Sequence, residues 1–179
     1  SFNHETYQTL HIWKKENDRT NLTLHPIYAP DVVAKFAGAG MARKIGMDEA
    51  IRRFNAINKP NGTIVSLDSD CLVSPNYLQQ IESCFAGNKY CFAATINFKH
   101  RFEEMNDPKQ KQGIQLYEDY LHYYKNALDF TGFPDSIYTI GSAFAVRAEA
   151  YVKQGGMNRR QAGEDFYFLN KLTKLGHIM

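Results

Sequence analysis

Two carboxylates one residue apart, Asp68 and Asp70, follow a short apolar run at residues 63–67. Side chains of an extended chain alternate between its two faces, so Asp68 and Asp70 point the same way if the strand geometry continues. Two carboxylates in one small volume repel each other, and a divalent cation relieves that repulsion. Mg²⁺ commonly takes one or two protein carboxylates and completes its coordination with water and substrate phosphates. The pattern predicts a cation that holds a diphosphate, although Asp and Ser are also common in ordinary turns between a strand and a helix.

A second acidic pair, Glu164 and Asp165, opens the last helix that the sequence predicts. Carboxylates in the first turn complement the partial positive charge of a helix N-terminus, which explains both residues without any catalytic role. The functional alternative is a general base, because a helix N-terminus keeps a carboxylate ionised at neutral pH. Taken by themselves, the two residues favour the structural explanation.

A glycine-rich segment, Gly38-Ala39-Gly40, precedes the basic pair Arg43 and Lys44 and leads into a helix that is predicted to reach residue 57. Glycines ahead of a helix that begins with basic residues suit an approaching phosphate or nucleotide. They also suit any tight turn. Because the full nucleotide-binding fingerprint is missing, this segment alone favours the turn.

Composition narrows the class of protein. The 179 residues are enough for one well-buried domain and short for two, so residues 1–179 are expected to form a single domain. The 44% hydrophobic content indicates a globular protein, and a formal net charge of +2 offers no large basic excess for nucleic acid or anionic lipid. No apolar run approaches the roughly 20 residues of a membrane-spanning helix, and no signal-peptide pattern is present.

Cysteine usage favours a reducing compartment. The three cysteines, Cys71, Cys84 and Cys91, cannot all pair within one chain, and none belongs to a Cys-x-x-Cys pattern. Reduced thiols in a soluble, cytoplasmic protein fit best. Nucleic-acid binding and a membrane span are not expected.

Strand patterns alternate with helix patterns along the chain. Helices are predicted at residues 5–16, from the glycine-rich segment to 57, after the Ser74-Pro75 helix opening, and at 110–130, 148–154 and 163 onward. Strands are predicted at residues 22–28, 63–67, 90–96 and 137–140. This alternation predicts an α/β fold with a mainly parallel sheet between layers of helices.

The helix predicted at residues 110–130 carries an unusual number of tyrosines. Tyr117, Leu121 and Tyr124 recur at helical spacing, which indicates one face of an amphipathic helix. The tyrosines are expected at the core and its rim, since a tyrosine buries its ring and keeps its hydroxyl in water. The alternative is that they line a ligand groove.

Four short segments, taken in order, resemble those of family 2 glycosyltransferases, nucleotide-sugar-dependent enzymes of the GT-A fold. They are Gly-x-x-x-Ala-Arg at residues 38–43, Leu-Asp-Ser-Asp at 67–70, Gly-Ser-Ala-Phe-Ala-Val-Arg at 141–147, and Gly-Gly-Met at 155–157 leading to Gly-Glu-Asp at 163–165. The resemblance covers the chain from about residue 38 onward. It implies an α/β, Rossmann-like fold whose mixed, mainly parallel sheet is flanked by helices.

The resemblance also implies roles for particular residues. Asp70 would be the principal ligand of Mn²⁺ or Mg²⁺ bridging the donor diphosphate, and Asp68 would contact the ribose or the metal region. Arg43, together with Lys44, would lie beside the nucleotide. The donor would be a nucleoside-diphosphate sugar, with a UDP-sugar favoured.

The remaining implied roles concern the sugar and the acceptor. Asp165, assisted by Glu164, would act as the base in a direct, inverting transfer to an acceptor hydroxyl. The acceptor could be a glycan, a lipid-linked molecule or a protein. The sugar and acceptor region would be shaped by four small residues: Gly141, Ser142, Gly155 and Gly156.

The sequence also departs from that family. An apolar first strand is missing, and so is the acid expected at the end of the next strand. We therefore expect the chain to be a fragment of a longer protein, with any membrane association supplied by parts outside it. His177 is a candidate for a later metal-binding histidine, although a single histidine is more typical of a solvent-facing position.

Three alternatives stay open from the sequence. Residues 67–70 also resemble the opening motif of haloacid-dehalogenase-type phosphatases, but Cys71 stands where that family has Thr or Val. A sugar nucleotidyltransferase shares the fold class, but its Gly-rich opening signature is missing. The third alternative is a domain that binds a nucleotide or glycan without catalysis.

Overall fold

The computed structural model describes residues 2–17 and 21–179, which divide into two compact units, Ser1–Ala37 and Gly38–Met179. The smaller unit contains the helix α1 (Phe2–Glu16) and the 3₁₀ turn η1 (Ala34–Phe36). The predicted helix at residues 5–16 is confirmed. The predicted strand at 22–28 is wrong: apart from a one-residue bridge at Leu22, the segment has no regular structure, and Pro26 lacks the N–H that a ladder needs.

The larger unit has an α/β architecture, as predicted from the alternating patterns. Its helices are α2 (Ala39–Ala56), α3 (Tyr77–Gly87), α4 (Pro108–Phe130), α5 (Ala148–Lys153) and α6 (Glu164–Leu172), with a 3₁₀ turn, η2 (Phe102–Glu104). Its strands are β1 (Thr63–Ser66), β2 (Cys91–Thr95), β3 (Phe144–Arg147) and β4 (His177–Ile178). None of the helices within the described ranges combines the length and apolarity that crossing a membrane requires.

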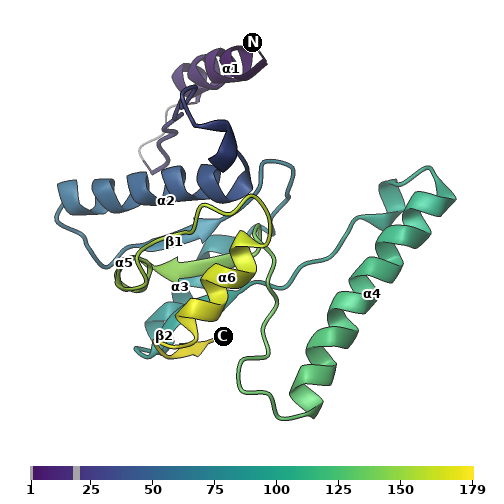
Figure 1. Ribbon diagram of the computed structural model, residues 1–179. Helices are drawn as coiled ribbons and strands as arrows, with labels where there is room; N and C mark the ends of the chain where they lie inside the picture. The colour runs from purple at the N-terminus through teal and green to yellow at the C-terminus, as the bar shows by residue number, and fades with distance from the viewer. Residues whose placement is uncertain (1, 18–20) are drawn as a thin grey trace. The chain divides into compact units, whose positions relative to one another are not determined.

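The four strands form one mixed sheet in the order β1-β3-β2-β4 (Figure 1). Strand β3 is antiparallel to both β1 and β2, and only β2 and β4 are parallel. The prediction of a mainly parallel sheet is therefore wrong. After β2 the chain passes through α4 and returns to the sheet at the end of the sheet where β2 finished. The Ile96 amide, just after β2, donates to the Ala143 carbonyl, just before β3, at 2.8 Å. A strand that begins at that end must run antiparallel to β2.

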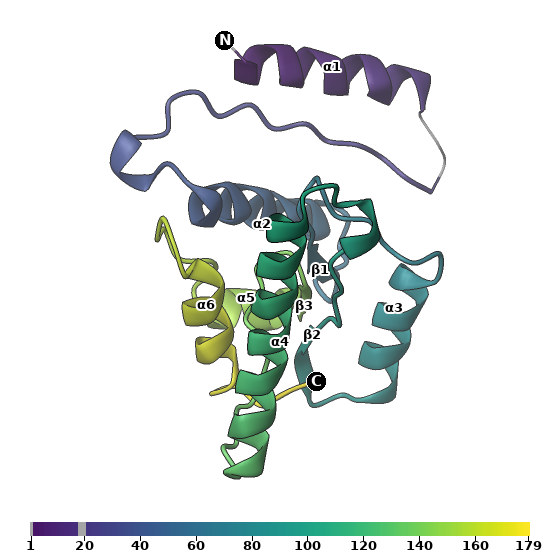
Figure 2. The ribbon, with the colours of Figure 1, turned by 90° about the vertical axis from the view of Figure 1, so that its right-hand side faces the viewer.

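Strand β3 is the centre of the core. Phe144, Ala145 and Val146 have no exposed surface, and their side chains alternate between the two faces of the sheet. Phe144 and Val146 pack on the side covered by α2, α5 and α6, whereas Ala145 packs on the side of α3 (Figure 2). The sheet is thus a layer between helices, with its middle strand buried on both faces.

Helix α3 and strand β3 begin after the positions that the sequence predicted for a helix and a strand. Helix α3 begins at Tyr77, because the Ser74 carbonyl accepts the Tyr77 amide in a turn that precedes the helix. The strand predicted at residues 137–140 is irregular, and β3 follows it at 144–147. The parallel pairing of β4 with β2 extends one residue past β4, to Met179, whose amide donates to the Ala93 carbonyl at 3.1 Å.

Helix α4 is attached to the unit through a charged residue. Glu118 is the one residue of α4 that is buried, and its Oε2 accepts the His100 amide at 2.7 Å and lies 2.6 Å from Nδ1 of the His100 ring. Beside it, Phe98 stacks on His122 with ring centroids 5.5 Å apart. The tyrosines of α4 are exposed, so the prediction that they belong to the core is wrong.

The Glu118 contact generates a pH prediction. Burial raises the pKa of Glu118, but hydrogen bonds from the His100 amide and ring, with the charges of His100 and His122, outweigh burial and bring the pKa below its usual 4.5. A carboxylate with a lowered pKa stabilises the fold above the unfolded-state pKa, and this contribution is lost as the pH falls through the folded-state pKa. We expect the difference in unfolding free energy between wild type and Glu118→Gln to shrink below about pH 4.5.

The measurement is urea unfolding of both proteins between pH 3 and pH 7, with the values extrapolated to water. Glu103→Gln is the matched control, since it also removes one negative charge but at a side chain that is 72% exposed. A wild-type advantage over Glu118→Gln that stays constant through the acid range would contradict the prediction.

Candidate functional site

The Arg43 side chain, on α2, lies between two carboxylates from distant parts of the chain. Its Nη2 donates to Oδ1 and Oδ2 of Asp68, at 2.8 and 3.1 Å, and its Nη1 donates to Oε1 of Glu164. A guanidinium presents its N–H groups in a rigid planar fork, so one arginine can bind two carboxylates at once. We call Arg43, Asp68 and Glu164 the arginine triad. It joins α2, the segment after β1, and the first turn of α6.

The triad is more buried on one side than on the other. The side chains of Glu164 and Arg43 are 6% and 14% exposed, whereas that of Asp68 is 49% exposed. The two carboxylates share one guanidinium, which leaves one negative charge in the group uncompensated. Loss of the Arg43–Glu164 pair should therefore lower the free energy of unfolding the most, since a buried charge without its partner strongly destabilises a fold.

Two glycines leave room for side chains of the arginine triad. A Cβ on Gly141 would lie 2.6 Å from Cζ and Nη2 of Arg43, so only glycine leaves room for the guanidinium. A Cβ on Gly40 would lie 2.3 Å from the Arg160 carbonyl oxygen and 2.9 Å from Cβ of Glu164. The sequence left a phosphate or a tight turn open for Gly40, and the resemblance implied that Gly141 shapes the sugar and acceptor region. The atoms against them in the structure are those of the chain itself.

Lys44 and Gly156 belong to a different group. Lys44 Nζ lies 2.9 Å from Asp48 Oδ2, and the Tyr151 hydroxyl donates to Asp48 Oδ1 at 2.7 Å. Burial, and also the bond to Asp48, raise the pKa of Tyr151, so the phenol keeps its proton and donates it. A Cβ on Gly156 would lie 3.1 Å from the Tyr151 hydroxyl oxygen and 3.3 Å from Lys44 Nζ. None of these contacts connects Lys44 or Gly156 to the triad.

Asp70 and Asp165 also lie outside the contacts of the triad. Asp70 is exposed, and its Oδ1 is 3.9 Å from Cys71 Sγ. Asp165 is half-buried, and its Oδ1 accepts the Phe166 amide at 2.7 Å. Their roles as metal ligand and base stay predictions.

The other small residues and the histidine also keep untested roles. Ser142 is half-buried beside Gly141. Gly155 is exposed and has φ +75°, a backbone conformation that favours glycine. His177 is exposed at the start of β4, which agrees with the solvent-facing alternative.

A metal would have to be held by very few protein ligands. Among residues 2–17 and 21–179, no three or more His, Cys, Asp or Glu side chains are grouped so that they could hold a metal ion. Asp68 is engaged by Arg43, so Asp70 is the carboxylate of the pair that is open to a cation. One carboxylate with water and diphosphate oxygens is a normal environment for Mg²⁺, and the donor set fits a cation that arrives with its substrate.

Two residues of the site were not predicted. Ser66 is buried in β1, and its Oγ donates to the Gly141 carbonyl at 2.6 Å, which ties the end of β1 to the segment before β3. Asn158 Nδ2 donates to the Glu164 carbonyl at 2.7 Å and so fixes the start of α6. A serine on the inward face of a predicted strand is the only sequence signal for Ser66, and Asn158 has none.

No family model matches the chain, and no curated protein or solved structure is similar to it. The resemblance of the four segments to family 2 glycosyltransferases therefore stays a prediction. The structure adds to this resemblance the contacts among residues of the four segments.

Removing the guanidinium tests the triad. We expect Arg43→Met to lower the unfolding free energy by about 3 to 5 kcal/mol, because it leaves the buried Glu164 carboxylate unpaired. Adding Glu164→Gln to this variant should restore part of the loss, since the unpaired charge is then gone. Urea unfolding at pH 7 measures both.

Arg52→Met is the matched control. Arg52 is also on α2 and also pairs with a glutamate, Glu49, but its side chain is 64% exposed. We expect its replacement to cost less than about 1 kcal/mol. Equal losses for Arg43→Met and Arg52→Met would show that the triad does not hold the unit together.

Proposed function

We propose that the chain is the catalytic part of a metal-dependent, inverting glycosyltransferase that moves a sugar from a nucleoside-diphosphate donor, a UDP-sugar, to an acceptor hydroxyl. The observation that carries this proposal is the arginine triad. Arg43 contacts Asp68 and Glu164 and lies against Gly141, so residues from all four segments that resemble the family meet at one guanidinium. The meeting of the four segments at one side chain supports the proposal.

We infer different roles for the two aspartates after β1, because Arg43 engages Asp68. Arg43 holds both oxygens of Asp68, which makes Asp68 a positioning residue at the edge of the site. Asp70 is then the ligand for Mn²⁺ or Mg²⁺. When bound, the cation supplies a Lewis acid that stabilises the negative charge developing on the departing diphosphate.

Glu164 and Asp165 also separate into two roles. Glu164 is buried and bound to Arg43, so it is unsuited to exchange protons with a substrate. It fixes the first turn of α6, and Asp165 follows it with a partly exposed carboxylate. The acceptor hydroxyl loses its proton to Asp165 as its oxygen bonds to the anomeric carbon. The bond from that carbon to the diphosphate breaks on the opposite face, and the nucleoside diphosphate leaves.

The phosphatase alternative is less well supported. In a phosphatase of the haloacid-dehalogenase type, the first aspartate of the motif, Asp68 here, attacks the phosphorus. Both oxygens of Asp68 accept hydrogen bonds from Arg43, and a carboxylate that is tied up in this way is a poor nucleophile.

Nucleotide binding is the first test. We expect UDP-glucose with Mn²⁺, at about 100 times its dissociation constant, to raise the melting temperature by on the order of 5 °C, because a ligand that binds only the native state stabilises it. Asp70→Ala should remove the part of the shift that depends on Mn²⁺. Differential scanning fluorimetry with other nucleoside diphosphates and their sugars, each with and without Mn²⁺, identifies the donor. Asp119→Ala, at an exposed aspartate on α4, is the control.

The base role is tested separately. We expect Asp165→Asn to keep the nucleotide-induced shift and to lower turnover by about 10² to 10⁴-fold, the usual contribution of a general base. Release of UDP from the donor, with and without acceptor, is the readout. An Asp165→Asn protein that turns over normally would remove Asp165 from the role, and a wild-type protein that binds the donor without any turnover would favour a non-catalytic binding domain.

A further inference from the structure

Three sulfur atoms from separate elements meet beside α3. Cys84 lies on α3, Cys91 begins β2, and Met179 directly follows β4. Cys84 Sγ lies 3.8 Å from Met179 Sδ, and the thiols of Cys84 and Cys91 are hydrogen-bonded to each other within one packed cluster. We call these three residues the sulfur cluster. The proposed catalysis uses none of them.

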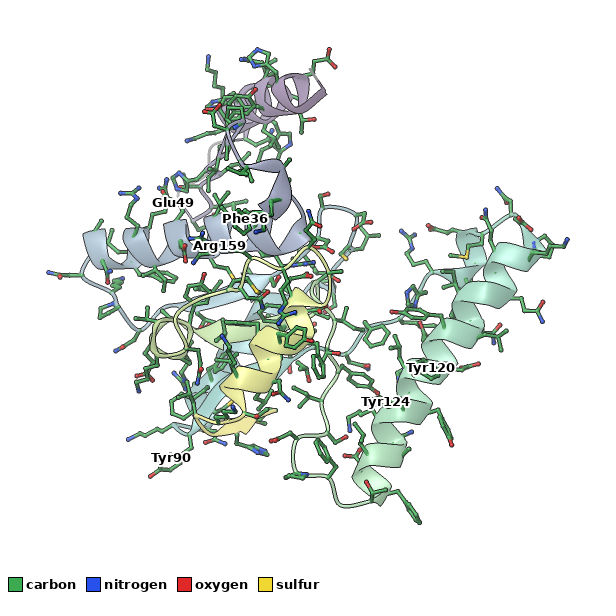
Figure 3. All side chains as sticks on the ribbon, viewed as in Figure 1. Phe36, Glu49, Tyr90, Tyr120, Tyr124 and Arg159 are labelled. Carbon is green, nitrogen blue, oxygen red and sulfur yellow. The ribbon has the colours of Figure 1, made fainter. Side chains whose placement is uncertain are left out.

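The sheet holds two of the three sulfurs in place. Cys91 has no exposed surface, and its thiol donates to the Ala93 carbonyl at 3.1 Å. Tyr90, the residue before Cys91, is 79% exposed (Figure 3), so the chain directs Tyr90 outward and Cys91 inward as it enters β2. The Met179 carbonyl accepts the Thr95 amide at 2.6 Å, and the Met179 amide bonds to Ala93 as described above. The sulfur cluster is therefore built on the sheet, not on a free loop.

Solvent reaches the cluster through two of its members. Cys84 is half-buried and Met179 is 50% exposed, whereas Cys91 is completely enclosed. An ion can approach past the two outer sulfurs and bind the inner one last. Met157, which is 2% exposed, is by contrast a sulfur that is enclosed in the core and serves packing.

A positive charge stands beside the cluster. Arg147 Nε donates to the Cys91 carbonyl at 2.7 Å, and Nη2 of the same guanidinium donates to the carbonyls of Phe85 and Asn88 at 2.6 and 3.1 Å. These partners are neutral carbonyls, so they do not cancel the charge of Arg147. Two thiolates on a monovalent cation carry one net negative charge, and an adjacent guanidinium stabilises that charge.

The types of ligand select the ion. Thiolates and thioethers are soft donors, which favour Cu(I). Zn²⁺ normally takes four ligands from Cys, His and carboxylates. Within residues 2–17 and 21–179, no His, Asp, Glu or further Cys completes a group of three with the two cysteines. Cu(I) is satisfied by two or three sulfurs, so the thioether of Met179 is a suitable third ligand.

The spacing of the sulfurs also fits one shared ion. Sulfur ligands bind a first-row metal at about 2.3 Å, and at an S–metal–S angle of about 110° to 120° two of them are about 3.8 to 4.0 Å apart. The 3.8 Å between Cys84 Sγ and Met179 Sδ lies in that range. An ion can therefore bind both without a change in their separation.

We propose that the sulfur cluster binds one Cu(I) ion through the thiolates of Cys84 and Cys91 and the thioether of Met179. Both thiols lose their protons to solvent on binding, and copper stays Cu(I), so the step needs no oxidant or reductant. The bound ion joins α3 to β2 and to the residue after β4, and so stabilises the packing of α3 on the sheet. The inference is independent of the proposed function, since it concerns other residues and another ion.

The test is a Cu(I) titration of the full chain, reduced and free of oxygen, in competition with the coloured chelator bathocuproine disulfonate. We expect one Cu(I) per chain. Cys84→Ser should weaken binding at least about 100-fold, because a hydroxyl is not a soft ligand. Met179→Leu should weaken it about tenfold, because it removes the neutral thioether but keeps the size of the side chain. Circular dichroism verifies the fold, and Met179→Leu, at a half-exposed residue, decides the test if Cys84→Ser does not fold.

Cys71→Ser is the matched control. Cys71 is also a half-buried free thiol, but it lies after β1 and outside the sulfur cluster. Its replacement should leave the Cu(I) affinity unchanged. Equal losses for Cys71→Ser and Cys84→Ser would show that copper binds exposed thiols without regard to their position, and would overturn the inference. A wild-type chain that binds no Cu(I), or variants of the cluster that bind it as tightly as wild type, would do the same.

X-ray absorption at the copper edge identifies the ligands directly. We expect three sulfur neighbours at about 2.3 Å in the wild type and two in Met179→Leu. Nitrogen or oxygen neighbours in their place would overturn the inference. The melting-temperature shift with UDP-glucose and Mn²⁺ should be the same in Met179→Leu as in wild type, so failure of the copper site and failure of the proposed function are separate results.

Discussion

One guanidinium, that of Arg43, connects the parts of this chain that could do chemistry. It binds Asp68 after β1 and Glu164 at the start of α6, and it fits against Gly141 just before β3. Each of these contacts restricts the others, because the planar fork of an arginine satisfies two carboxylates only in a narrow range of geometries. The lack of a side chain at Gly141 and the packing of Gly40 against Glu164 are consequences of this arrangement.

The sheet supplies the rigid frame for that interaction. Strand β3 is buried on both faces and pairs with β1 and β2 on either side, so the ends of these strands are fixed relative to one another. Ser66 adds a side-chain hydrogen bond from β1 to the Gly141 carbonyl. Side chains held by such a frame are more precisely placed than side chains on a free loop, as the proposed transfer between two substrates would require.

Local patterns predicted most elements, but not how they come together. Helices with regular apolar spacing and strands bounded by turn residues were predicted within a few residues, as for β1, β2 and α6. Strand β3 was missed because its Phe-Ala-Val run is apolar on both faces and lacks the alternation that signals a half-buried strand. Without β3, nothing in the sequence indicated that the sheet was mostly antiparallel.

The candidate site shows the same limit. The acidic and glycine motifs identified Arg43, Asp68 and Glu164 individually, but Arg43 and Glu164 are 121 positions apart, and a contact of that range leaves no trace in one sequence. The partner of Lys44, by contrast, is Asp48, one helical turn away on α2. For α4, helical spacing gave the helix but not its inward face, since the residue that faces inward is the charged Glu118 and the tyrosines that looked apolar face water.

The way α4 is attached has a consequence for the motions of the chain. A helix that buries one hydrogen-bonded carboxylate beside a small cluster of rings loses little apolar contact when it detaches, whereas β3 cannot leave the sheet without opening the whole core. Proteins open locally where buried apolar contacts are few. Backbone amides of α4 should therefore exchange with solvent through brief local unfolding, whereas those of β3 should exchange only when the entire unit unfolds.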